Sequence, residues 1–185
     1  MPDLGSLYLE EVLRDLRGHK RLADAAVAQL DDQQLFAAPD PESNSVAIIV
    51  KHMAGNFRSR FTDFLTTDGE KADRNRDQEF VMTADRSRAQ LLRWWEQGWQ
   101  ILLDTIGALQ PSDLERTVTI RGQPHSVLQA LNRSLAHCAY HVGQITFLAK
   151  HWKGGDWKSL SVPKGQSEQF NAKMFEKNKQ KIEGS

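Results

Sequence analysis

The chain has 185 residues, with 24 basic and 24 acidic side chains and a formal net charge of zero. This length suits one domain, and 39% hydrophobic with 26% charged residues is the composition of a globular protein rather than a disordered one. The balanced charge offers no basic surface for nucleic acid or an anionic membrane, and no apolar run approaches the roughly 20 residues that cross a bilayer. We therefore expect a cytoplasmic protein that binds neither, and a single cysteine that forms no internal disulfide fits a reducing compartment.

Two helices are predicted in the first third of the chain, because apolar residues recur there with the 3.6-residue period. The first spans about residues 4–30. A connection over residues 31–41 follows, and its two prolines cannot continue a helix. The second helix has a capping residue within 43–45 and an apolar face that continues to about Leu65. This face requires burial against other helices.

The polar segment over residues 66–79 shows no regular spacing of apolar residues, and it is interpreted as a surface loop. A third helix is predicted from an N-cap at Thr83, with Asp85 in its first turn, to Leu109 before Pro111. Three of the five tryptophans lie in this helix, where core packing is the expected role.

The fourth predicted helix begins at Ser126, which forms a capping-box pattern with Gln129 three residues later. A short strand or extended arm over residues 117–121 precedes it, because β-branched residues alternate there. Four long helices with almost no strand predict an all-α four-helix bundle over residues 1–152. Residues 153–185 are predicted to form a loop and a polar tail that packs on the bundle or extends from it.

Three histidines are the candidate functional residues of the sequence. His137 and His141 are four residues apart on the fourth helix, so their side chains point the same way one turn apart and can share an ion. His52 lies beside the apolar face of the second helix, so a bundle that packs the two helices together brings all three imidazoles to one place. Three neutral imidazoles suit zinc, nickel, copper or iron(II) and leave a position open for water or substrate. Asn56 and Gln144, each one turn from a ligand, are candidates to orient an imidazole, water or substrate.

Plainer interpretations compete with this one, because a His-x3-His pair in a helix also arises by chance. A structural or surface role is expected for the three remaining histidines, His19, His125 and His151. Cys138 lies on the apolar stripe of the fourth helix and is expected to be packed rather than to bind metal. Glu96 is expected to be an exposed carboxylate rather than a base.

The segment from His137 to Ile145 reads His-Cys-Ala-Tyr-His-Val-Gly-Gln-Ile, and Val-Lys-His-Met surrounds His52 far upstream. Together they make the chain resemble the DinB-like superfamily over about residues 4–152. The resemblance implies a four-helix bundle in which His52, His137 and His141 bind one divalent metal, with zinc or nickel preferred over iron or manganese. It points to a branch of that superfamily without a characterised function.

Characterised members of that superfamily include transferases and isomerases that use a low-molecular-weight thiol, so the resemblance implies a metal-dependent S-transferase acting on a small molecule. The first alternative is a hydrolase in which the metal activates water. The second is a module without catalytic activity that the metal stabilises for binding or stress response. The resemblance also implies a homodimer, formed through the third helix or the tail.

Overall fold

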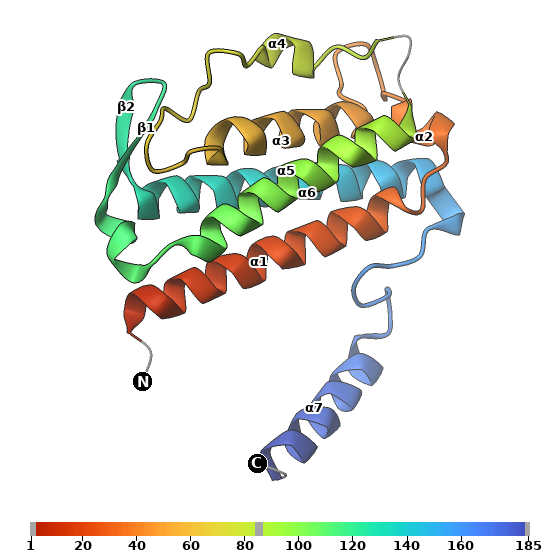
Figure 1. The fold of residues 1–185 in the computed structure, drawn as a ribbon. Helices are drawn as coiled ribbons and strands as arrows, with labels where there is room; N and C mark the ends of the chain where they lie inside the picture. Colours follow the sequence, from red (N-terminus) through yellow and green to blue (C-terminus); the bar gives the residue numbers. More distant parts are fainter. Residues whose placement is uncertain (1–2, 84–86, 184–185) are drawn as a thin grey trace.

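Four long helices lie side by side and make up the body of the protein (Figure 1). The computed structural model describes residues 3–83 and 87–183. The long helices are α1 (Leu4–Val27), α3 (Val46–Phe61), α5 (Arg88–Ala108) and α6 (Val127–Lys153). The chain is therefore mostly helical, with one small two-stranded sheet among the described residues, in agreement with the expected all-α class.

The core lies between these helices, and each contributes the apolar stripe that its sequence predicts. α3 packs mainly on α5, and α1 packs mainly on α6. The largest fully buried side chains include Leu16, Met53, Trp95, Trp99, Leu131 and Ile145. Where α5 crosses α3, a Cβ on Gly98 would lie 2.9 Å from the Cα of Ala54. The glycine therefore permits an approach of the two backbones that any side chain would prevent.

Serine side chains fix the first turns of three of the long helices. Ser45 accepts the backbone N–H of Ile48 at the start of α3, and Ser126 forms the predicted capping box with Gln129 at the start of α6. The prediction for α5 was wrong by one turn, because α5 begins at Arg88 and its N-cap is Ser87. Thr83 lies outside the helix, and Asp85 lies outside the described residues.

Short elements occupy both connections that were expected to be irregular. The first contains α2 (Asp32–Phe36), with a capping box of its own. The segment 66–79, expected as a surface loop, contains α4 (Arg76–Glu79), and Glu79 is buried. Ordered polar contacts explain the difference: the hydroxyl of Ser59 on α3 donates to the carbonyl oxygen of Gly69 and accepts the N–H of Lys71. Hydrogen bonds, rather than an apolar period, hold this segment against the body.

The predicted strand is one half of a hairpin. Strand β1 (Thr117–Ile120) pairs antiparallel with β2 (Gln123–Ser126), after the short 3₁₀ helix η1 (Pro111–Glu115). Arg121 and Gly122 form the turn, both with positive φ, and their N–H groups both donate to the carboxylate of Asp68. Asp68 therefore ties the hairpin to the segment 66–79.

The C-terminal region is helical, whereas the sequence predicted only a polar tail. After the 3₁₀ helix η2 (Gly154–Asp156) and a loop, α7 (Ser167–Glu183) is drawn apart from the four long helices in Figure 1. The side chains of residues 167–180 are exposed, so they add little to the core. Within the described ranges, no helix combines the length and the apolar character needed to cross a membrane.

Candidate metal centre

Three imidazoles meet between α3 and α6. The candidate ligand atoms of His52, His137 and His141 all lie within 4.8 Å of one another. Nε2 of His52 lies 3.3 Å from Nε2 of His137, and the rings of His137 and His141 have centroids 4.5 Å apart. The structure thus brings the three predicted ligands close enough to hold one metal ion.

The two helices position these rings by different means. His137 and His141 are neighbours because residues four apart in a helix share a face. His52 joins them only because α3 packs against α6, and its side chain is just 6% exposed. The ring of Phe80 stacks on that of His52 with centroids 4.8 Å apart, and it covers one face of the imidazole.

Hydrogen bonds to the outer ring nitrogens orient two of the three imidazoles. Nδ1 of His52 lies 2.8 Å from Oε2 of Glu79, and Nδ1 of His141 lies 2.8 Å from Oε1 of Gln144. Carboxylate and amide oxygens accept, so each Nδ1 carries the proton and donates it. Each Nε2 then keeps its lone pair for a metal, as in metal sites where a carboxylate supports a histidine ligand.

Glu79 is itself held on three sides. Arg74 donates from Nε to Oε1 at 2.8 Å and from Nη2 to Oε2 at 3.0 Å. A Cβ on Gly55 would lie 2.4 Å from Oε1, so the carboxylate occupies space that only glycine leaves free. Burial raises the pKa of Glu79, but the hydrogen bonds from His52 and Arg74 outweigh it and leave the pKa below its ordinary value. The supporting group is therefore an ionised carboxylate.

The protonation of the two α6 histidines suits metal binding. Burial, assisted by the neighbouring imidazoles, lowers the pKa of His137 to about 3, and burial also lowers that of His141. Both rings are neutral at pH 7 and can act as ligands. Zn–N bonds of about 2.0–2.1 Å in a tetrahedron place two nitrogens about 3.3–3.4 Å apart. The Nε2 separation of 3.3 Å between His52 and His137 fits that geometry.

Of the two predicted supporting residues, the structure connects one to the triad. Gln144 bonds His141, whereas Asn56 lines the adjoining cavity and makes no hydrogen bond to a triad imidazole. Cys138 is fully buried, and burial raises the pKa of its thiol to about 12, so packing is its role. Glu96 is exposed and forms an ion pair with Lys20.

Sequence reasoning missed Glu79, Arg74 and Gly55. A buried histidine ligand commonly has a carboxylate partner, which makes an acidic residue somewhere in the chain an expectation. The polar segment 66–79 offers several acidic residues, and no spacing rule connects any of them to His52. Only the path of the segment across α3 selects Glu79.

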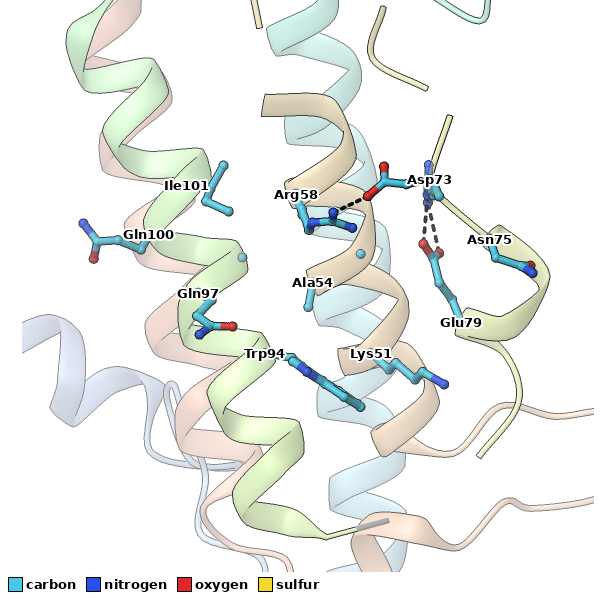
Figure 2. A pocket seen from close by; sticks show the side chains of 13 residues that line it. Lys51, Ala54, Arg58, Asp73, Asn75, Glu79, Trp94, Gln97, Gln100 and Ile101 are labelled. Carbon is cyan, nitrogen blue, oxygen red and sulfur yellow. Dashed lines mark hydrogen bonds and ion pairs between the residues drawn. The ribbon is translucent and has the colours of Figure 1, made fainter. Parts of the chain in front are cut away.

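Two cavities are lined by residues of this centre. One of about 270 Å³ is lined by His52 and His137. The larger, about 640 Å³, lies between α3, the segment before α4, and α5, with Trp94 and Ile101 in its wall (Figure 2). Arg74 and Glu79, which bond each other, also line this larger cavity, and Glu79 is labelled in Figure 2. A ligand in the larger cavity would contact the residues that support His52, whereas one in the smaller cavity would contact the imidazoles.

Comparison with known proteins returns one family. Its model matches residues 3–166 and is described as a protein of unknown function, DUF1572. No curated protein matches the chain.

Proposed function

The chain belongs to the uncharacterised DUF1572 family, and from its site we propose that it binds one divalent metal ion through Nε2 of His52, His137 and His141. The observation that carries this proposal is the pair of Nε2 atoms 3.3 Å apart, with the outer nitrogen of His52 bonded to a buried carboxylate. Imidazoles in this arrangement stabilise a bound cation and contribute little to folding without one.

We further propose that the fold is a DinB-like four-helix bundle. Four long helices run side by side, and the histidines come from the second and fourth of them, α3 and α6. This is the distribution that the resemblance to the DinB-like superfamily implies.

The catalytic proposal is a metal-dependent transferase that activates a low-molecular-weight thiol. An ion with three neutral ligands is a strong Lewis acid and lowers the pKa of a coordinated thiol or water. The thiol sulfur bonds to an electrophilic carbon of the second substrate, its proton passes to solvent, and the leaving group departs with its bonding electron pair. Cys138 is buried and protonated, so the reacting thiol comes from a separate molecule.

A free carboxylate base is missing beside the triad. Of the carboxylates that pair with residues lining the smaller cavity, Glu79 bonds His52 and Arg74, and Glu70 forms ion pairs with arginines. Neither is free to remove a proton, so a thiol or a water molecule at this site would lose its proton through the metal alone. Hydrolysis through activated water is the second candidate and needs no thiol.

The metal proposal is tested first, by elemental analysis of untagged protein after zinc reconstitution. We expect about one ion per chain in the wild type and loss in His52→Ala and His137→Ala. His151→Ala is the matched control, because His151 lies on α6 with an exposed side chain and outside the triad. A wild type that takes up no ion, or triad variants that keep it, would contradict the proposal.

The reaction is tested on the metal-loaded protein with small electrophiles, in the presence and absence of low-molecular-weight thiols. Turnover that requires a thiol and disappears in His137→Ala supports the transferase. Ester or amide cleavage at the same rate without thiol would replace it with the hydrolase. If both screens are blank and metal removal only lowers the melting temperature, the role is structural.

A further inference from the structure

The cavity of about 270 Å³ beside His52 and His137 is lined by a cluster of arginines. They come from five separate parts of the chain: α3, the segment before α4, α4 itself, the hairpin turn and α6. The members of this arginine cluster are Arg60, Arg74, Arg76, Arg121 and Arg133. Like charges repel, so five guanidinium groups around one cavity raise the free energy of the protein unless anions compensate them.

Protein carboxylates compensate only part of this charge. Glu70 forms ion pairs with Arg60, Arg74 and Arg121, and Glu79 accepts from Arg74 and His52. The nearby Asp68 carboxylate accepts the backbone N–H groups of the hairpin turn.

Two members of the arginine cluster have no carboxylate partner within the described part of the chain. Arg76 lies with its guanidinium carbon 5.0 Å from the centre of the Phe80 ring, and Arg133 forms no ion pair there. Both residues are exposed and line the cavity, so a ligand can reach them. The cavity therefore has unpaired positive charge next to the triad.

Arg60, which also lines this cavity, has spare hydrogen-bonding capacity. Its side chain is 9% exposed, and Nη1 has no hydrogen-bond partner among the described residues. Leaving a buried charged donor unsatisfied is unfavourable, and such groups normally find an acceptor. Arginine presents its donors in a planar fork that matches the two oxygens of a carboxylate or phosphate.

We propose that the arginine cluster binds an oxyanion group, carboxylate or phosphate, of the substrate whose reacting atom lies at the histidine triad. The inference rests on the proposed function for the reaction, but anion binding by the arginines needs no metal. At about 270 Å³ the cavity is slightly smaller than ligand pockets of about 300–1,000 Å³, so the substrate is a small molecule. The arginines fix its anionic end, and His52 and His137 line the same space.

The test is an NMR titration of the metal-free, isotope-labelled protein at low ionic strength, with inorganic phosphate in one arm and malonate in the other. The two arms separate a phosphate from a carboxylate. We expect saturable binding of at least one anion, with shifts at the backbone amides of Arg121 and Gly122. Arg133→Gln and Arg76→Gln should each weaken it by about tenfold, the usual effect of losing one charge-assisted contact.

Arg93→Gln is the charge-matched control, because Arg93 is exposed on α5, donates to Gln90 and does not line the cavity. Equal weakening by Arg93→Gln and Arg133→Gln, or no saturable binding of either anion, would overturn the inference. So would binding that appears only after zinc loading and is unaffected by Arg133→Gln, since the anion would then be bound by the ion. If the arginine-dependent binding is present in protein that takes up no metal, the anion site stands and the metal proposal fails.

Discussion

Replacing Gly55 by alanine tests whether the buried carboxylate of Glu79 positions His52. The new Cβ would lie 2.4 Å from Oε1 and 2.9 Å from Cδ of Glu79, well inside van der Waals contact. A free glutamate would rotate away, but this one is held by Arg74 and His52. We therefore expect the carboxylate to leave Nδ1 of His52 and the imidazole to lose its fixed orientation.

The magnitude follows from two opposing contributions. A buried N–H left without its acceptor costs about 2–3 kcal/mol, while alanine in place of glycine within a helix gains about 1 kcal/mol. The net loss in the free energy of unfolding is then about 1–2 kcal/mol. Loss of the carboxylate support lowers metal affinity by about 10–100-fold. Stability and affinity are thus reduced together, by similar free energies, since a 10–100-fold loss is about 1.4–2.7 kcal/mol.

The assay is a competitive zinc titration against a chromophoric chelator, with urea unfolding of the same samples. Gly143→Ala is the matched control: Gly143 lies in α6 two residues from His141, and a Cβ there would meet no atom within 4 Å. It should keep the zinc affinity and stabilise the helix by about 0.5–1 kcal/mol. An unchanged zinc Kd in Gly55→Ala would refute the reasoning, because the carboxylate would then be dispensable for His52.

Three further outcomes are expected. In the folded metal-free protein the pKa of His137 is about 3, so below pH 6.5 this imidazole binds a proton more readily in the unfolded chain. The free energy of unfolding should therefore decrease as the pH is lowered, by up to about 1.4 kcal/mol per pH unit for this residue. Urea unfolding between pH 7.5 and 5 measures it, and an equal slope in His137→Gln would argue against this origin. Ser126→Ala removes the N-cap of α6 and should lower the free energy of unfolding by about 1 kcal/mol. The control Ser159→Ala, at an exposed position, should change it almost not at all, and equal losses in the two variants would contradict a stabilising role of the cap. With its pKa raised to about 12 by burial, Cys138 should resist a thiol reagent at pH 8 until urea unfolds the chain, and rapid native labelling would show an accessible thiol.

Local patterns in the sequence were enough to predict the long helices. Apolar residues at helical spacing place α1, α3, α5 and α6, because each buries one stripe, and the capping box at Ser126 gives the start of α6 to the residue. The same periodicity puts His137 and His141 on one face. Each of these inferences depends only on residues within a few turns of one another.

Contacts between distant segments decided the rest. The sequence placed α5 one turn too early, because a cap depends on the path of the chain that enters the helix. Residues 66–79 were predicted to be a surface loop, because the polar contacts that hold them against α3 produce no regular spacing of apolar residues. Glu79, Arg74 and Arg76 are near the triad only through that path. The spacing of apolar residues indicates which face of a helix is buried, whereas the element that packs on that face depends on how the whole chain folds.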